Sequence, residues 1–199
     1  ETPERLVENL VWNSFCSNNL AVFLPKYFET NPFARKRPPK PKIGIVAKGC
    51  DLRSIVTLIK EQQAPRDHVV LVGVPCQGMI DKDKIEAAIA EKTPRAQDAE
   101  ITQCREEDGM LYVSTKIGNE HMFERETFLQ DACKDCRYPM PEGTDYLLDG
   151  EARNPGDGGH APIEKFESQS PQERWDYFVG EMSKCIRCNA CRQACPTCW

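Results

Sequence analysis

The sequence contains no hydrophobic run long enough to form a helix that crosses a bilayer. Its longest apolar run, Val69–Val74, has the length of a strand, far below the roughly 18 residues of a membrane helix. No signal peptide is visible, although Glu1 is not an initiator methionine. We therefore expect no membrane insertion and a cytoplasmic location.

The sequence also lacks the motifs of common catalytic and nucleotide-binding sites. It has no Walker loop, no glycine fingerprint of a dinucleotide-binding domain and no serine–histidine–acid order. Only 3 of its 199 residues are histidine, and a net charge of -5 does not favour binding to nucleic acid. We therefore expect no catalytic residues and no nucleic-acid partner.

Cysteine, in contrast, is abundant. The 11 cysteines indicate either a disulfide scaffold or metal sites. Secreted disulfide domains are mostly short and poor in regular cores. Here the middle of the chain has the pattern of an ordinary α/β core, and most cysteines stand at metal-ligand spacings. We therefore expect metal sites, a reducing cytoplasm and an anaerobic source.

The densest group of cysteines ends the chain with the spacing Cys-x2-Cys-x2-Cys-x3-Cys-Pro. Its members, with one further cysteine after the proline, are Cys185, Cys188, Cys191, Cys195 and Cys198. This is the bacterial ferredoxin spacing, in which two-residue gaps let a tight turn direct three thiolates at one inorganic cube. Zinc sites, the alternative, usually pair two knuckles across a longer gap. We therefore predict a ferredoxin-like 4Fe–4S segment over residues 171–199, with Cys195 or Cys198 as the fourth ligand.

The middle of the chain alternates the patterns of strand and helix. Residues 43–47 form a short apolar run typical of a buried strand, and residues 68–74 form the next. Between them, residues 52–63 carry apolar side chains at helical spacing after Asp51, a plausible N-cap. Strand, helix and strand with short connections predict a right-handed parallel unit. The expected fold class is therefore α/β, a small parallel or mixed sheet with flanking helices.

Cys50 and Cys76 each follow the C-terminal end of one of these strands. Because parallel neighbours lie about 5 Å apart, we expect both thiols at one edge of the sheet, where open α/β sheets bind ligands. Two inert turn cysteines or a disulfide are the alternatives. Cys133 and Cys136 form a Cys-x2-Cys pair that by itself fits zinc, iron–sulfur or a redox dithiol. With the first two cysteines they complete four thiolates, enough for one 4Fe–4S cluster.

The remaining patterns divide the chain into parts. We expect an N-terminal helical segment with a basic, proline-rich linker over residues 1–42, followed by an α/β iron–sulfur domain over residues 43–150. A second linker over residues 151–170 then leads to the ferredoxin-like segment over residues 171–199. Further helices are predicted from Thr2-Pro3 and over about residues 83–92, 123–130 and 171–184, with a hairpin over residues 99–116. Cys16 and Cys104 have no partner at ligand spacing, and both are predicted to be structural, with Cys16 as a small buried hydrophobic residue.

Three short motifs resemble those of a known family. They are Gly49-Cys50-Asp51-Leu52-Arg53-Ser54, Gly73-Val74-Pro75-Cys76-Gln77-Gly78 and Cys133-x2-Cys136. They resemble the C-terminal domain of the beta subunits of the deazaflavin-coenzyme hydrogenases and dehydrogenases, with relatives attached to heterodisulfide-reductase-type complexes. The resemblance covers about residues 43–150, and the terminal segment is similar to the ferredoxin module often fused to such domains.

The resemblance implies an iron–sulfur protein that passes electrons between a flavin or deazaflavin site and other subunits. No glycine-rich flavin-binding segment is present in this sequence. We therefore expect one or two 4Fe–4S clusters that relay electrons between partner subunits of an oxidoreductase complex, with ferredoxin as a further partner. The alternatives are a subunit that itself reduces a flavin or deazaflavin and a zinc-stabilised interaction module. A ferredoxin module supplies further cysteines, so we also expect residues beyond Trp199.

Overall fold

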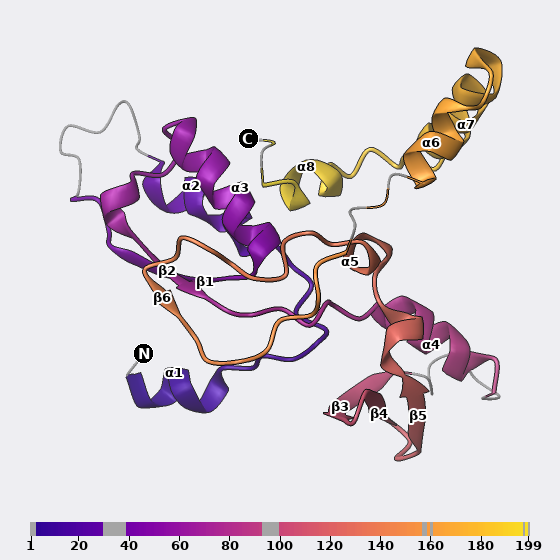
Figure 1. The fold of residues 1–199 in the computed structure, drawn as a ribbon, viewed down its shortest axis with the longest axis horizontal. Helices are drawn as coiled ribbons and strands as arrows, with labels where there is room; N and C mark the ends of the chain where they lie inside the picture. Colours follow the sequence, from indigo (N-terminus) through magenta and orange to yellow (C-terminus); the bar gives the residue numbers. More distant parts are fainter. Residues whose placement is uncertain are drawn as a thin grey trace. The chain divides into compact units, whose positions relative to one another are not determined.

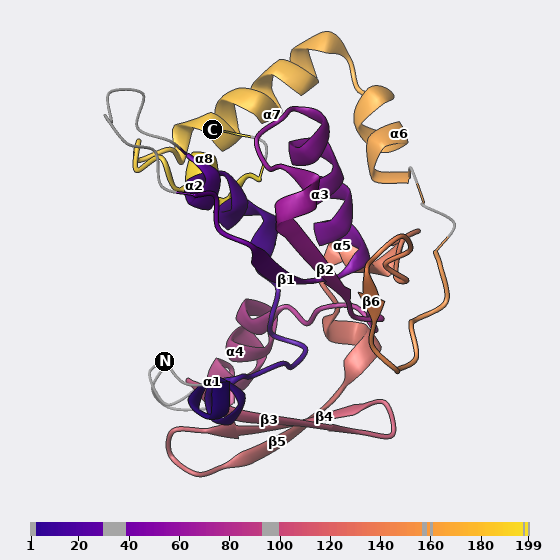
Figure 2. The same ribbon diagram turned by 90° about the vertical axis from the view of Figure 1, so that its left-hand side faces the viewer.

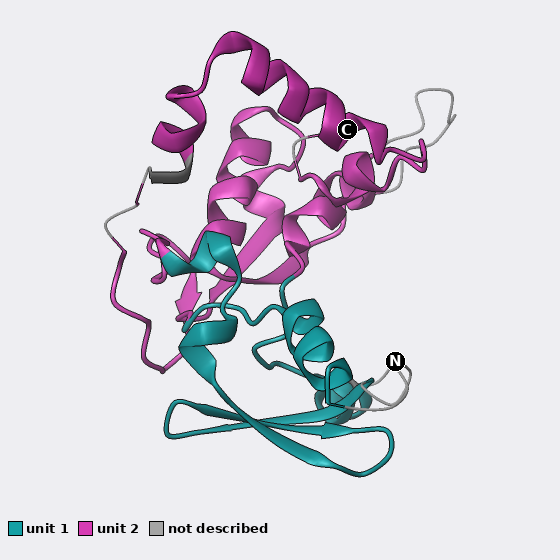
Figure 3. Cartoon of the chain, turned by 90° about the vertical axis from the view of Figure 1, so that its right-hand side faces the viewer, with its two compact units in different colours: residues 1–17, 77–134 teal, residues 18–76, 135–199 magenta. Residues whose placement is uncertain are grey.

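The computed structural model describes residues 3–29, 39–92, 100–156, 159, 161–196 and 198. Figures 1 and 2 show the chain from two sides. It divides into two units, coloured separately in Figure 3: unit 1 comprises residues 1–17 and 77–134, and unit 2 comprises residues 18–76 and 135–199. The predicted basic linker falls largely on residues 30–38, and the predicted N-cap on Thr2, both outside the described residues.

Unit 2 is built on a parallel three-stranded sheet with the strand order β1-β2-β6. Strands β1 (Ile43–Ala47) and β2 (Val69–Gly73) run parallel with Ala47 opposite Gly73, and β6 (Tyr146–Leu147) pairs in parallel with the other side of β2. The predicted strands β1 and β2 and their parallel pairing are confirmed. Strand β6 was not predicted, because its two residues are exposed and carry no apolar alternation.

The core of unit 2 lies between this sheet and α3 (Gly49–Lys60). Helix α3 buries one stripe, whose innermost residues Ile55 and Leu58 are fully enclosed against Leu71 of β2. Burying each such side chain contributes about 1.5–3 kcal/mol relative to leaving it exposed. The same core is closed by the short helices η1 (Leu20–Phe23) and α2 (Leu24–Phe28).

One sequence prediction about a helix start in unit 2 is corrected. Helix α3 begins at Gly49, and Asp51 is its third residue, not its N-cap. The reason is that the Asp51 carboxylate reaches back and accepts the backbone N–H of Lys48 at 3.0 Å. In the same unit, Pro25 occupies the first turn of α2. A proline is tolerated there because the first turn needs no intrahelical N–H donor.

Asp145 fixes the start of β6 against β2. Its carboxylate accepts the backbone N–H of Leu71 at 2.7 Å and a guanidinium N–H of Arg66. The bond to Arg66, followed by the bond to Leu71, holds the pKa of Asp145 below its ordinary value. The ionised carboxylate therefore stabilises the folded chain.

Replacing Asp145 by asparagine is expected to reduce the amount by which the free energy of unfolding falls between neutral and acid pH. A carboxyl whose pKa is lowered on folding contributes stability above its unfolded pKa of about 3.9 and loses it as the pH falls through the folded value. The stability lost in Asp145→Asn should thus be larger near neutral pH than at about pH 3. Urea unfolding midpoints at the two pH values measure it. The control is Asp149→Asn, an exposed neighbour, and an equal loss at both pH values would contradict the expectation.

Unit 1 is built on an antiparallel sheet with the order β3-β4-β5 (Figure 2). Its elements with their bounds are β3 (Ile101–Glu107), β4 (Met110–Thr115), β5 (Glu120–Glu124) and the helices α1 (Pro3–Asn9) and α4 (Lys82–Ala90). Ile85 and Ile89 of α4 are fully buried with Leu111 and Val113 of β4 in one core. The predicted helix over about residues 83–92 and the predicted hairpin are confirmed.

The predicted helix over residues 123–130 is wrong in its first part. Phe123 lies in β5, opposite Leu111 of β4, and is 8% exposed within the core. After β5 follow a short helix, η4 (Arg125–Phe128), and α5 (Asp131–Lys134). Phe123 thus serves a strand instead of the predicted helix, because pairing with β4 outweighs the local pattern.

Three helices occupy the C-terminal part of unit 2. They are α6 (Ala161–Glu167), α7 (Pro171–Ser183) and α8 (Ala190–Ala194). Helix α7 confirms the prediction over residues 171–184 and starts with a capping box between Ser170 and Glu173. Helix α6 lies inside the segment predicted as a linker. None of the helices in the described ranges is long and apolar enough to span a membrane.

Candidate functional site

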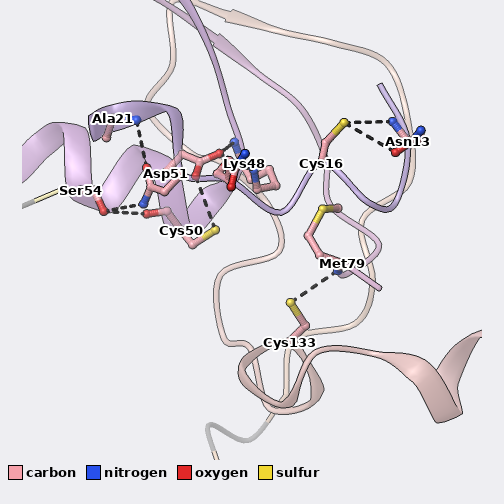
Figure 4. A network of polar contacts seen from close by, with 11 residues as sticks. Asn13, Cys16, Ala21, Lys48, Cys50, Asp51, Ser54, Met79 and Cys133 are labelled. Carbon is pink, nitrogen blue, oxygen red and sulfur yellow. Dashed lines mark hydrogen bonds and ion pairs between the residues drawn. The ribbon is translucent and has the colours of Figure 1, made fainter. Parts of the chain in front are cut away.

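Cys50 lies in the first turn of α3, directly beyond β1 (Figure 4). Two buried charges flank it. The Lys48 ammonium lies 2.8 Å from the Asp51 carboxylate, and the two side chains are only 2% and 1% exposed. The ammonium also donates to the carbonyl of Asn18 at 3.3 Å, and the Ser54 hydroxyl donates to the Cys50 carbonyl at 3.4 Å. These bonds fix the backbone that carries the Cys50 thiol.

Cys76 follows the end of β2, and its backbone is held on both sides. Its N–H donates to the Pro139 carbonyl at 2.9 Å, and its carbonyl accepts the N–H of Arg153 at 3.0 Å. Because β1 and β2 are parallel and in register, Cys50 and Cys76 leave the sheet at the same edge. The Cys76 thiol contributes to the rise in the pKa of the Cys50 thiol. This common edge was predicted from the sequence, and the parallel pairing confirms it.

Burial raises the pKa of the Cys50 thiol to about 11. The Asp51 carboxylate and the Cys76 thiol contribute less to this rise in pKa, and the Lys48 ammonium acts against it. The group is therefore a protonated thiol at neutral pH, a form with little nucleophilic reactivity. A metal that binds here displaces this proton, because thiolates and not thiols ligate metals.

The Cys-x2-Cys pair lies where the chain passes from one unit to the other. Cys133 belongs to α5 in unit 1, and its sulfur accepts the backbone N–H of Met79 at 3.4 Å. Cys136 belongs to unit 2, and its carbonyl accepts the N–H of Gly156 at 2.8 Å. The assembly of these two cysteines with Cys50 and Cys76 remains a prediction.

All 11 cysteines lie in the described part of the chain, and each is a free thiol. The disulfide considered for Cys50 and Cys76 is thus not present. Among the described residues, no three histidine, cysteine or acidic side chains gather closely enough to hold a metal ion. The donor chemistry fits an iron–sulfur cluster, because free thiols stand at one sheet edge and at ligand spacing. The full ligand sets remain a prediction.

The backbone between the C-terminal cysteines turns tightly. Arg187 and Asn189 have positive φ angles of 57° and 59°, so each two-residue gap of the motif contains one residue in the left-handed conformation. The Arg187 N–H points back to the Cys185 sulfur at 3.4 Å. Helix α8 then carries the chain on, and the Cys195 N–H donates to the Cys191 carbonyl at 3.1 Å. Cluster binding by this segment remains a prediction.

The two cysteines predicted to be structural are both half-buried. Cys16 was predicted as a buried hydrophobic residue, but its sulfur accepts the N–H of Asn13 at 3.4 Å and donates to the Val11 carbonyl at 3.7 Å. Cys104 of β3 packs against the core of unit 1, and burial raises the pKa of its thiol to about 11. Neither residue has a second cysteine at metal-ligand spacing in the sequence.

The sequence did not predict a cleft in unit 2, next to Cys76. It has a volume of about 640 Å³ and is lined by α3, residues 137–142 and residues 152–155. Its walls carry the arginines Arg53, Arg137 and Arg153, which are too far apart in the sequence to form a motif. Only the fold brings these side chains to one cleft.

Two comparisons with known proteins bear on this site. The family described as the C terminus of the coenzyme F420 hydrogenase/dehydrogenase beta subunit matches residues 40–148. Among solved structures, the fold is similar to a chain of the F420-reducing NiFe hydrogenase complex from Methanosarcina barkeri, with 14% identity and a TM-score of 0.38. That similarity covers 72% of this chain and 61% of the other, less than two thirds of its length.

The family match takes in the strand-end cysteines Cys50 and Cys76 and the Cys133–Cys136 pair, and it covers more than half of the residues. The chain therefore belongs to the coenzyme F420 hydrogenase/dehydrogenase beta subunit family, a family of oxidoreductase subunits, through that family's C-terminal domain.

Proposed function

We propose that this chain is an iron–sulfur subunit that relays electrons between partner subunits of an oxidoreductase complex. The complex would be of hydrogenase, dehydrogenase or heterodisulfide-reductase type, in the cytoplasm of an anaerobe. The observation that carries this proposal is the placement of Cys50 and Cys76 at one edge of a parallel sheet, each on a backbone fixed by hydrogen bonds. Membership of a family of hydrogenase and dehydrogenase subunits supports it.

Two sets of thiolates would hold the clusters. The first set is Cys50, Cys76, Cys133 and Cys136, within an α/β domain over residues 43–150. The second is Cys185, Cys188 and Cys191, with Cys195 or Cys198 as the fourth, in a ferredoxin-like segment over residues 171–199. A 4Fe–4S cluster, when bound, supplies one-electron transfer. The chain's own residues ligate it and hold its surroundings in place.

The electron donors and acceptors would be other subunits of the complex, with ferredoxin as a further partner. All 11 cysteines are free thiols in the described part of the chain, so those of the two sets are available to ligate a metal. We assign the reaction of the complex to its partner subunits.

The metal content of the full chain tests this proposal. Protein purified without oxygen should be brown, absorb broadly near about 400 nm and contain about eight iron and about eight acid-labile sulfide atoms per chain. Colourless protein with stoichiometric zinc would instead establish the zinc-stabilised interaction module. A yellow cofactor released on denaturation would establish a subunit that itself reduces a flavin or deazaflavin.

A further inference from the structure

Helix α7, labelled in Figure 2, exposes large apolar side chains along one side. We use the name α7 stripe for Trp175, Phe178, Val179 and Met182, whose spacing of three and four residues places them on one face of the helix. Their exposed fractions are 58%, 52%, 46% and 53%. A contiguous apolar patch of this kind on a protein surface marks an interaction site.

The opposite side of α7 packs against the chain itself. The Tyr177 ring meets the Phe166 ring of α6 edge-to-face, with the ring centroids 5.4 Å apart. On the α7 stripe, the rings of Trp175 and Phe178 stack on each other, with their centroids 5.7 Å apart. The stripe is thus ordered by contacts within α7, and α6 packs on the side away from it.

The length of α7 favours burial of the α7 stripe by another molecule. The helix has 13 residues and begins with a capping box, but an isolated helix of about 12–15 residues is only marginally stable in water. In proteins, most of the stability of such a helix comes from packing of its apolar face. No residue of α7 is buried within the described chain. A second molecule on the stripe would supply that packing.

The charges beside the α7 stripe favour a second copy of α7 as that molecule. Arg174 and Glu181 lie along one edge of the stripe, seven residues or about two turns apart. This spacing is too long for an ion pair within one helix. When two such helices pair in antiparallel, the arginine of each copy comes opposite the glutamate of the other, and the two-fold axis makes this pair twice. In a parallel pair, Arg174 would instead face Val179 of the other helix.

Both charged side chains can make this contact. Arg174 is half-buried, and its Nε atom has no hydrogen-bond partner among the described residues. Glu181 is paired with Lys184 of its own helix but remains 49% exposed, so it can accept a second cation. Beyond the other edge of the stripe, the Asp176 carboxylate accepts the amide N–H of Gln172 at 2.8 Å. An acidic group on a second helix therefore matches Arg174.

We propose that α7 pairs in antiparallel with α7 of a second copy of this chain, burying the two stripes against each other. Phe178 and Val179 meet at the centre of the pair. On either side, Trp175 packs against Met182 of the second copy, a favourable contact between an aromatic ring and a polarizable sulfur. The two ion pairs lie along the edge of this apolar contact. The inference concerns assembly and goes beyond the proposed electron relay, which does not depend on a second copy.

Sedimentation velocity of the full anaerobic chain tests the inference. A reductant is present throughout, because disulfides between the free thiols of two chains would also join them. We expect the unchanged chain to be a dimer at roughly 100 μM. Phe178→Glu should weaken the dimer by about a hundredfold or more, because it places a charge at the centre of the apolar contact in both copies.

Tyr177→Glu is the matched control. Tyr177 lies on the same helix and is 57% exposed, against 52% for Phe178, but it faces away from the α7 stripe. We expect this variant to form the dimer as the unchanged chain does. Circular dichroism shows whether each variant is folded, and the Phe178 variant is expected to be, because α7 contributes no buried residue to the core.

Charge reversal tests the antiparallel arrangement. Arg174→Glu and Glu181→Arg should each weaken the dimer by about threefold or more, because each places like charges opposite one another. The two changes combined should restore the dimer, since opposite charges face each other again. A monomeric unchanged chain, a dimer unaffected by Phe178→Glu, an equal loss in Tyr177→Glu or no recovery in the double variant would overturn the inference. Iron measured in the same samples tests the electron relay separately, because neither result depends on the other.

Discussion

Replacing Lys48 by methionine is expected to lower the free energy of unfolding of unit 2 by about 3–5 kcal/mol. Lys48 and Asp51 form an ion pair of 2.8 Å with both side chains almost fully buried. Methionine fills a similar volume but leaves the Asp51 carboxylate without its cation. The backbone N–H at position 48 still donates to this carboxylate, so the helix cap is retained. The loss therefore reports the buried charge together with the bond from Lys48 to the Asn18 carbonyl, and guanidinium unfolding followed by circular dichroism measures it.

A double variant and a surface control make this expectation specific. Lys48→Met combined with Asp51→Asn removes both charges and should recover much of the lost stability, because a neutral pair leaves no charge buried alone. Lys60→Met, at the exposed end of the same helix, should change stability by less than about 0.5 kcal/mol. If the Lys48 variant were no less stable than the Lys60 variant, the ion pair would contribute nothing to the fold.

The parts of the fold that could be predicted are those whose signals are local. Strand β1 was predicted with its observed bounds, because a buried parallel strand is a continuous apolar run between turn residues. The start of α3 was missed by three residues, because the rule for N-caps favours Asp51 over Lys48. Strands β5 and β6 depend on pairing with β4 and β2, and nothing in their own residues indicates those partners.

In the candidate site, too, some features could be predicted from the sequence and others depend on the fold. The shared edge of Cys50 and Cys76 could be predicted because parallel strands place their C-terminal ends together. The half-buried, hydrogen-bonded state of Cys16 could not, because it depends on the fold around Asn13. The cleft next to Cys76 also could not, since Arg53, Arg137 and Arg153 come from separate segments that only the fold brings together.

Cys76→Ser is expected to lower the iron content of the anaerobic chain from about eight to about four atoms. Under the proposed function, it removes one of the four thiolates of the first set and leaves the C-terminal set intact. Serine has nearly the same shape, and the bonds of this residue to Pro139 and Arg153 come from its backbone. A loss of iron in a folded variant thus reports ligation and not packing. Iron and sulfide analysis measures it, with electron paramagnetic resonance of the reduced protein.

Two further variants determine what that result means. Cys16→Ser changes a half-buried cysteine outside both sets and should keep about eight iron atoms per chain. Cys188→Ser should lose the other cluster, so that its combination with Cys76→Ser leaves almost no iron. Unchanged iron in Cys76→Ser, with complete loss in Cys188→Ser, would instead place all the iron at the C-terminal motif. The sheet edge would then carry two thiols without a cluster, and the electron path would lie entirely within the segment after Ser183.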